Sequence, residues 1–436
     1  MARIWNGEIS KALVVENPAR ELDELLQDSG VDVLRLENTP DEDGLIAAVN
    51  SFGAQAIFKR SKVGVSRRVI ESCPSLLVVQ LCCIGDDSVD KSACAEHGVM
   101  VFNDPVSNGR SVVELVIGSL IAQSRRLFET TTPCRTGKWE KNNRDRYEIL
   151  GKTLGVIGLG NIGRAVARAA EHLGMSIVFF DTRQVSIELG KELGWSYVES
   201  IEECFKVSDC ITIHLSAQDV EGLSNQDRIS ADSLKLLGAQ RPPGPRVLIN
   251  FARGFLFPPT ALIEAIECGA IRRAAVDVYP VEPRLGQVWE NPYKDCPEVA
   301  VFPHIGASTQ EAQPRIAARV ADTFLSFSRY GTVRDTPFKV RAKLRLSAQG
   351  KPGQYLLMVC HSTARGTKRA IDEAIYEANI SNVSSVHRDF DDYGFAYDLA
   401  LLDAKLDEKA VNDIINRAAS LTGDAAAIRS VRQAPA

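Results

Sequence analysis

The chain has 436 residues, of which 45% are hydrophobic and 25% charged, and its formal net charge is −5. This length exceeds the number of residues that one hydrophobic core usually serves, so we expect two or three domains. The small acidic excess gives no electrostatic reason for a nucleic-acid or anionic-membrane partner, and the apolar runs are too short or too interrupted to span a bilayer.

The ten cysteines are scattered along the chain, and Cys82 and Cys83 are adjacent within an apolar run. Because no secretion signal is recognisable, we expect reduced thiols in a cytoplasmic protein. The chain contains no C-x-x-C or H-x-x-x-H cluster. Local spacing therefore gives no support for a metal site.

The first part of the chain alternates short β-rich runs with helical patterns, which predicts a parallel sheet with helices on both faces. The expected strands span residues 12–15, 31–36, 56–59, 76–82 and 100–102, with helices near 18–28, 41–52, 66–72 and 88–97. A long helix, residues 111–128, leads out of this series.

A glycine-rich turn follows the next apolar strand and begins a helix. Gly158, Gly160 and Gly163 have the G-x-G-x-x-G spacing, and a second strand ends at Asp181. In this fingerprint the glycines permit a tight turn, close approach of a pyrophosphate and close helix–strand packing. An acidic residue about 20 positions further on binds the ribose hydroxyls and repels a 2′-phosphate, so the pattern predicts a Rossmann fold that binds NAD.

Three further polar side chains follow expected strands, at the end of a sheet where open α/β folds bind ligands. They are Arg253, Glu282 and His304. Hydride transfer from an alcohol to NAD needs a base, a cation that holds the acid and a group that tunes the base. A guanidinium binds a planar carboxylate through two parallel hydrogen bonds, and a carboxylate beside a histidine fixes its tautomer. The three residue types therefore indicate a dehydrogenase site.

The end of the chain forms a separate small unit. Residues 335–354 combine prolines, glycines and basic residues, which is typical of a linker. The pattern beyond it predicts strands at 355–360, 383–390, 395–402 and 427–431, and helices at 367–378 and 408–418. This βαββαβ order is ferredoxin-like.

The order of these motifs resembles the D-2-hydroxyacid dehydrogenase family. The motifs are Gly-x-Gly-x-x-Gly, Asn-x-Ala-Arg-Gly, Asp-Val-x-x-x-Glu-Pro and Pro-His-Ile-Gly. Residues 80–120 and 304–313 narrow the resemblance to the phosphoglycerate dehydrogenases of that family. The likeness covers about residues 10–330, and the last unit stands where those enzymes often carry an ACT domain.

The resemblance implies an α/β fold with two doubly wound parallel-sheet domains and a small C-terminal α+β domain. The implied parts are a discontinuous flavodoxin-like substrate domain (1–106 and 305–334), a Rossmann NAD domain (107–304), a linker (335–354) and an ACT-like regulatory or assembly domain (355–436). A homodimer or homotetramer is the implied assembly.

By position, the family pattern makes Arg253 the carboxylate clamp, His304 the acid/base and Glu282 its partner. Asp277 matches the residue that holds the nicotinamide amide, with a helix cap or salt bridge as its alternative role. His214 is the rival acid/base, although its place lines the cofactor in the family.

In the family, a proline usually stands two residues after the position of His214, where this chain has Ser216. The expected cofactor contacts gather at the glycine-rich turn and at strand ends. They are Gly158, Gly160, Asn161, Ile162, Gly163, Asp181, His214, Asp277 and Gly306.

A phosphorylated substrate needs a second anion site. Arg60, Ser61 and Lys62 follow a strand, Asn108 begins a helix, and both places contact substrate in the phosphoglycerate dehydrogenases. A solvated basic loop is the alternative for residues 60–62. Lys141 matches a basic residue that reaches a neighbouring subunit's site in the family.

ACT effector sites in this family resemble His-x-Asn-x-Pro-Gly. This chain has His361 but carries Thr363 and Arg365 in place of the asparagine and the proline. An amino-acid effector and a purely structural or assembly role are therefore both open for the last unit.

The implied activity is NAD-dependent oxidation of D-3-phosphoglycerate to 3-phosphohydroxypyruvate, the first step of L-serine biosynthesis. One alternative is a dehydrogenase for another 2-hydroxy acid, such as 2-hydroxyglutarate. A second is an NAD-sensing interaction protein of the same fold. The intact set of Arg253, Glu282 and His304 favours the enzyme.

Overall fold

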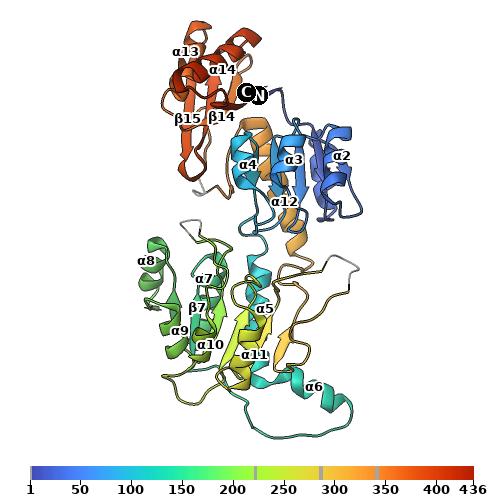
Figure 1. Cartoon of the computed structure of the whole chain (residues 1–436), viewed down its shortest axis with the longest axis vertical. Helices are drawn as coiled ribbons and strands as arrows, with labels where there is room; N and C mark the ends of the chain where they lie inside the picture. The colour runs from blue at the N-terminus through green and yellow to red at the C-terminus, as the bar shows by residue number, and fades with distance from the viewer. Residues whose placement is uncertain (1, 220–222, 284–287, 339–342) are drawn as a thin grey trace. The chain divides into compact units, whose positions relative to one another are not determined.

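The computed structural model describes residues 2–219, 223–283, 288–338 and 343–436. The chain divides into two compact units, one formed by Met1–Ser107 with Gln313–Ala436 and the other by Asn108–Ala312 (Figure 1). Within the described ranges, every helix is too short or too polar to traverse a lipid bilayer.

The first unit contains a five-stranded parallel sheet in the order β3-β2-β4-β5-β6. Counted from its own first strand this order is 2-1-3-4-5, the flavodoxin-like order, as predicted. The strands are β2 (Lys11–Val14), β3 (Asp32–Arg35), β4 (Ala56–Lys59), β5 (Val78–Leu81) and β6 (Met100–Phe102). The helices of this part are α1 (Glu21–Gln27), α2 (Glu42–Phe52), α3 (Arg67–Ser72), α4 (Lys91–Glu96) and α12 (Ala312–Tyr330).

The second unit contains a seven-stranded parallel sheet in the order β13-β12-β11-β10-β7-β8-β9. Counted from β7, this is the Rossmann order 3-2-1-4-5-6 with one further strand, which confirms the predicted fold. Its strands are β7 (Thr153–Ile157), β8 (Ser176–Phe180), β9 (Ser196–Tyr197), β10 (Cys210–Ile213), β11 (Val247–Asn250), β12 (Arg273–Val276) and β13 (Val299–Val301). Its helices are α5 (Gly109–Arg125), α6 (Leu127–Arg135), α7 (Asn161–His172), α8 (Gln184–Glu192), α9 (Ile201–Val207), α10 (Ala231–Lys235) and α11 (Pro259–Glu267).

The single helix predicted over residues 111–128 is wrong in one respect, because the structure divides it into α5 and α6. Arg126 lies between them with φ 58°, and a left-handed residue ends an α-helix. The Arg126 guanidinium pairs with Glu129 at 2.7 Å and donates to the Arg144 carbonyl at 3.2 Å. These contacts stabilise the boundary between α5 and α6. The hydrophobic periodicity on either side of Arg126 does not predict this boundary.

The C-terminal part of the first unit forms the predicted βαββαβ arrangement around a mixed sheet, β1-β17-β14-β16-β15. Its elements are β14 (Tyr355–Ser362), α13 (Thr367–Glu377), β15 (Asn382–Phe390), the 3₁₀ turn η1 (Asp391–Tyr393), β16 (Phe395–Leu402), α14 (Glu408–Thr422) and β17 (Ile428–Pro435). Of the linker predicted at 335–354, residues 339–342 lie outside the described ranges.

A fifth strand in this sheet comes from the other end of the chain. β1 (Arg3–Asn6) pairs with β17 in parallel, with Arg3 opposite Ser430, and the two termini lie side by side in Figure 1. The sequence pattern does not predict this strand, because four residues carry little periodicity and their partner lies at the opposite end of the chain.

Two arginines of β17, Arg429 and Arg432, attach the C-terminal sheet to the flavodoxin-like part of the same unit. The buried Arg432 guanidinium donates to the carbonyls of Phe327 and Ser328 at 2.6 and 2.5 Å, at the end of α12. Arg429 donates to the Ala95 carbonyl at 2.9 Å, in α4. Helix-terminal carbonyls lack partners within their own helix, so these donors satisfy groups that would otherwise be buried without one.

Candidate functional site

The glycine-rich turn lies between β7 and α7, and its first and third glycines are required by the chain's own packing. Gly158 has φ 94°, and a Cβ there would lie 2.7 Å from the His214 carbonyl oxygen. A Cβ on Gly163 would lie 2.0 Å from the Gly158 oxygen. The space over Gly160 is open by comparison, since its nearest neighbour would be the Arg183 guanidinium at 3.7 Å. This open face at the N-terminus of α7 fits a pyrophosphate.

Asp181, the predicted ribose acceptor, is nearly buried at the end of β8. Its Oδ2 accepts a hydrogen bond from the Leu159 amide at 2.7 Å, which ties the end of β8 to the glycine-rich turn. Its carboxylate also pairs with Arg183, whose Nη2 lies 3.1 Å from Oδ2. The dinucleotide fingerprint does not identify Arg183. A basic residue two positions after the acid was the available signal.

The turn after β11 carries Arg253 and is shaped by Asn250. The buried Asn250 side chain accepts from the Ala252 amide at 3.1 Å and donates to the Arg253 carbonyl at 3.0 Å. The Arg253 guanidinium donates to the Ala252 carbonyl at 2.9 Å. A Cβ on Gly254 would lie 2.0 Å from the carbonyl carbon of Tyr279, so only glycine fits after the arginine.

The segment after β13 brings His304 against Glu282. His304 Nδ1 lies 2.9 Å from both carboxylate oxygens of Glu282. With Nδ1–H donating to the carboxylate, the Nε2 lone pair is available on a side chain that is 49% exposed. His304 has φ 56°, an uncommon conformation for a non-glycine residue that requires support from its surroundings.

Asp277 supplies that support. One of its carboxylate oxygens accepts from the Ile305 amide at 2.8 Å and the other from the Gly306 amide at 2.7 Å. Burial raises the pKa of this carboxyl group, and the two amide hydrogen bonds offset part of the rise. Asp277 therefore anchors the segment that carries His304.

His214 follows β10 and lies beside the glycine-rich turn, since its carbonyl oxygen approaches Gly158. Its Nε2 is 2.9 Å from the Thr212 hydroxyl. Burial lowers the pKa of His214 to about 3, because a charged ring is poorly solvated there. His214 is thus neutral near neutral pH, and its position fits cofactor lining better than proton transfer.

The strand order assembles these residues at one edge of the sheet. β13, β12 and β11 are neighbours, so the segments that carry His304, Asp277 with Glu282, and Arg253 leave the sheet side by side. β10 and β7 follow in the same order and add His214 and the glycine-rich turn. A parallel sheet puts all of these strand ends at one edge, which is where open α/β folds bind ligands.

Comparison with known proteins agrees with this geometry. The model for the D-isomer specific 2-hydroxyacid dehydrogenase NAD binding domain matches residues 117–306. A putative D-3-phosphoglycerate dehydrogenase of Schizosaccharomyces pombe is 31% identical over 391 residues, covering 88% of this chain and 81% of the relative. The D-3-phosphoglycerate dehydrogenase of Haemophilus influenzae is 33% identical over 325 residues, 74% of this chain and 75% of the relative.

The chain belongs to the D-isomer specific 2-hydroxyacid dehydrogenase family. It is an NAD-dependent oxidoreductase whose substrate is a small hydroxy acid. Among solved structures, a glyoxylate reductase from Paecilomyes thermophila has a TM-score of 0.64 and 26% identity, covering 75% of this chain and 98% of that one.

The basic loop of this dehydrogenase lies in the first unit, directly after β4. Glu16 shapes it by accepting hydrogen bonds from the amides of Lys62 and Val63. Ser61 and Lys62 are exposed and Arg60 is half-buried. The sequence pattern does not identify Glu16, because this acid lies more than 40 residues before the loop that it holds.

Asn108 lies in the second unit, at the start of α5. Its side-chain Oδ1 is buried and has no hydrogen-bond partner among the described residues. The structure therefore gives the basic loop and Asn108 to different units, and each is described within its own unit.

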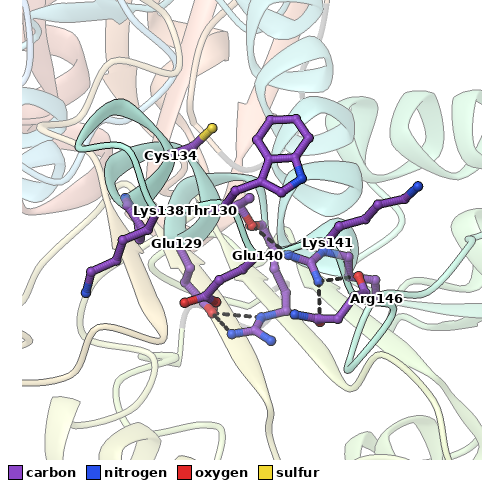
Figure 2. A pocket seen from close by; sticks show the side chains of 11 residues that line it. Glu129, Thr130, Cys134, Lys138, Glu140, Lys141 and Arg146 are labelled. Carbon is purple, nitrogen blue, oxygen red and sulfur yellow. Dashed lines mark hydrogen bonds and ion pairs between the residues drawn. The ribbon is translucent and has the colours of Figure 1, made fainter.

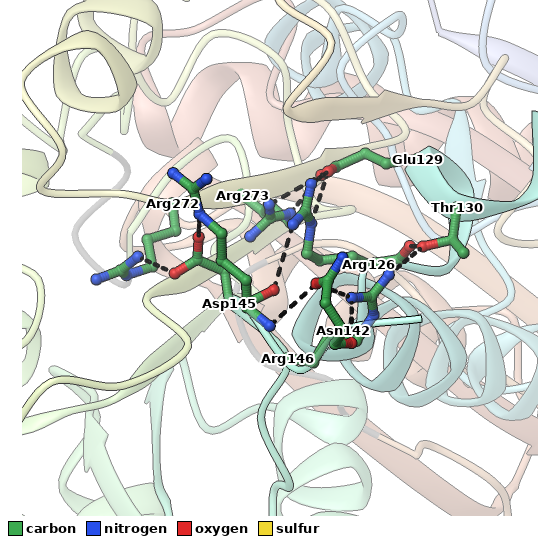
Figure 3. Close-up of polar contacts among 9 residues, drawn as sticks. Arg126, Glu129, Thr130, Asn142, Asp145, Arg146, Arg272 and Arg273 are labelled. Atoms are coloured by element: carbon green, nitrogen blue, oxygen red, sulfur yellow. Dashed lines mark hydrogen bonds and ion pairs between the residues drawn. The ribbon is translucent and has the colours of Figure 1, made fainter. Parts of the chain in front are cut away.

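A separate pocket of about 360 Å³ lies along α6 and the segment after it (Figure 2). Its lining includes Lys138, Lys141 and Trp139, and the Trp139 side chain is 83% exposed. Ion pairs hold this region to the start of β12, with Glu129 contacting Arg273 and Asp145 contacting Arg272 (Figure 3). The pocket therefore lies beside the first residue of β12, whereas Asp277 and the other candidate site residues follow the carboxyl ends of their strands.

Proposed function

We propose that this dehydrogenase oxidises D-3-phosphoglycerate to 3-phosphohydroxypyruvate, which is the first step of L-serine biosynthesis. The observation that carries the proposal is the His304–Glu282 pair, in which both nitrogen–oxygen contacts are 2.9 Å. His304 follows β13, and the Arg253 turn follows β11, two strands away in the same sheet. The names of the yeast and bacterial relatives support the phosphorylated substrate.

In this proposal His304 Nε2 takes the hydroxyl proton, and Glu282 stabilises the imidazolium that forms. Arg253 binds the substrate carboxylate and the developing carbonyl oxygen. Asp277 keeps His304 in place through the amides of Ile305 and Gly306. The chemistry that NAD supplies when bound is acceptance of a hydride from the carbon that carries the hydroxyl.

Arg60 and Lys62 are proposed to bind the phosphate, with Ser61 and Asn108 as further polar contacts. A loop whose backbone is held by Glu16 keeps its cationic side chains near one place, which lowers the entropy lost on binding an anion. A solvated basic loop with no ligand would not require this constraint.

Steady-state assays with NAD and D-3-phosphoglycerate test the proposal. The unphosphorylated acids 2-hydroxyglutarate and glycolate are assayed in parallel as alternative substrates. We expect the largest kcat/KM for the phosphorylated acid. Replacing both Arg60 and Lys62 with Ala should raise its KM about 10- to 100-fold per lost charged hydrogen bond and leave the unphosphorylated acids nearly unchanged. If the double replacement changed the KM of all three acids equally, the substrate would be assigned as another 2-hydroxy acid.

We also infer a cytoplasmic homodimer or homotetramer. An exposed Trp139 between Lys138 and Lys141 is typical of a protein–protein contact, since large exposed aromatic side chains mark interfaces. Trp139→Ala should lower the oligomer mass measured by light scattering at micromolar concentration. An unchanged mass would remove this segment from the interface.

A further inference from the structure

A polar cluster that the dehydrogenase reaction does not use lies in the C-terminal sheet, where three neighbouring strands each supply one side chain. Asp398 lies on the middle strand, β16, with His387 directly opposite on β15 and His361 one diagonal step away on β14. Asp398 Oδ2 is 3.0 Å from His361 Nε2 and 3.1 Å from His387 Nδ1. All three atoms lie within 4.8 Å of one another.

The other nitrogen of each imidazole has its own acceptor. His361 Nδ1 is 2.7 Å from the Ser362 carbonyl oxygen, and His387 Nε2 is 2.9 Å from a carboxylate oxygen of Asp389. If each of these nitrogens carries the proton, the remaining two lone pairs both point at the Asp398 oxygen. Two lone pairs repel a carboxylate oxygen unless a cation lies between them. Metal-bound histidines show this arrangement, with the second nitrogen donating to a carbonyl or carboxylate.

The environment of the cluster suits an ion of this kind. His361 and Asp398 are buried, whereas the His387 side chain is 33% exposed and leaves an opening to solvent. Lys368 Nζ lies 3.1 Å from Asp398 Oδ1, so the carboxylate presents one oxygen, Oδ2, to the imidazoles. Zinc bonds of about 2.0–2.1 Å at tetrahedral angles separate ligand atoms by about 3.3 Å. The two separations between an imidazole nitrogen and Asp398 Oδ2, 3.0 and 3.1 Å, are close to this value.

We propose that His361, His387 and Asp398 bind one divalent transition-metal ion of the zinc class, with water at the open position beside His387. The two imidazole ligands favour such ions over calcium or magnesium. Local sequence spacing gave no sign of a metal site because the three ligands come from three strands. The competing state is a cluster of two imidazolium rings held by Asp398 without a metal.

The test is a titration of the chelator-treated, full-length protein with Zn²⁺ in a calorimeter. We expect one equivalent that the unaltered protein binds and that His387→Ala and Asp398→Asn both lack. His172→Ala removes an exposed histidine elsewhere and should retain that equivalent. The exposed thiols of Cys134 and Cys268 are present in every variant, so their contribution cancels in the comparison.

Asp389→Asn tests the outer partner, which lies at an exposed position. It should weaken the affinity for Zn²⁺ about 10- to 100-fold, the effect typical of a lost outer hydrogen bond. Circular dichroism checks that each variant is folded. Equal Zn²⁺ binding by the unaltered protein and His387→Ala, or no binding by either, would overturn the metal site.

Discussion

At the scale of single residues, the candidate site includes side chains whose role is to fix the backbone beside Arg253 and His304. Asn250 shapes the turn of Arg253, and Asp277 binds the amides that follow His304. His304 adopts a left-handed conformation that costs free energy, so these hydrogen bonds are what keep its ring beside Glu282. The reactive groups and their supports therefore act together.

His304→Ala should lower kcat by about 10²–10⁴, because general acid/base transfer contributes about that much, while the Kd for NAD changes little. His214→Asn tests the rival acid/base and should keep more turnover than His304→Ala, since the His214 ring is already neutral near neutral pH. Stopped-flow assays give kcat, and fluorescence quenching gives the Kd. Loss of turnover in His214→Asn with turnover kept in His304→Ala would reverse the assignment of the acid/base.

Cofactor choice depends on the Asp181–Arg183 pair. Asp181→Ala removes the charge that repels a 2′-phosphate and leaves a cation, so the ratio of kcat/KM for NAD over NADP should fall at least tenfold. Arg183→Ala leaves the carboxylate unpaired and should raise the same ratio. Charged hydrogen bonds of about 1.5–3 kcal/mol set this scale. Parallel assays with both cofactors measure the ratio, and shifts in the same direction in both variants would refute the pairing argument.

At the scale of elements, the NAD site requires α7 to lie against β7 and the glycine-rich turn. A Cβ on Gly163 would clash with the backbone of Gly158, whereas one on Gly160 meets nothing closer than 3.7 Å. The two glycines therefore have separable roles, one in packing of the helix and one in access for the cofactor.

Gly163→Ala should lower the free energy of unfolding by about 1–3 kcal/mol, the usual cost of overpacking, and should weaken NAD binding as well. Gly160→Ala should keep the melting temperature and weaken only NAD binding. Calorimetric melting and NAD titration of both variants test this separation. An equal loss of stability in the two variants would show that Gly160 also serves packing.

At the scale of the whole molecule, the first and last segments of the chain form one sheet. β1 completes the sheet beside β17, and Arg432 attaches β17 to the end of α12. Arg432 is buried, and its guanidinium lies over the Phe327 ring, 4.9 Å from the ring centroid, which adds a cation–π interaction. The C-terminal sheet and the flavodoxin-like sheet are accordingly one compact unit.

Arg432→Met should destabilise this attachment, because each buried carbonyl left without a donor costs about 1–3 kcal/mol. Hydrogen exchange should rise in β17 and α12 and stay unchanged in β7, which belongs to the other unit. Arg388→Met, at an exposed position in β15, is the control and should leave exchange unaltered. Unchanged protection of β17 in Arg432→Met would show that the strand pairing alone attaches the sheet.

The sequence by itself determined the features that are local. The G-x-G-x-x-G turn, the order of strands and helices in each α/β series and the βαββαβ pattern all follow from hydrophobic period and glycine spacing over short stretches. The choice of Arg253, Glu282 and His304 rested on residue types after strands, and their roles stay predictions until the variants above are assayed.

Only the tertiary structure decided the features that join distant segments. Glu16 holds the loop at 60–62, Asp277 holds the amides after His304, and β1 enters a sheet built from the other end of the chain. The cluster of His361, His387 and Asp398 likewise needs three strands in register. The physical reason is the same in each case: these interactions depend on which strands and loops become neighbours, and hydrophobic periodicity sets the type of an element without naming its neighbour.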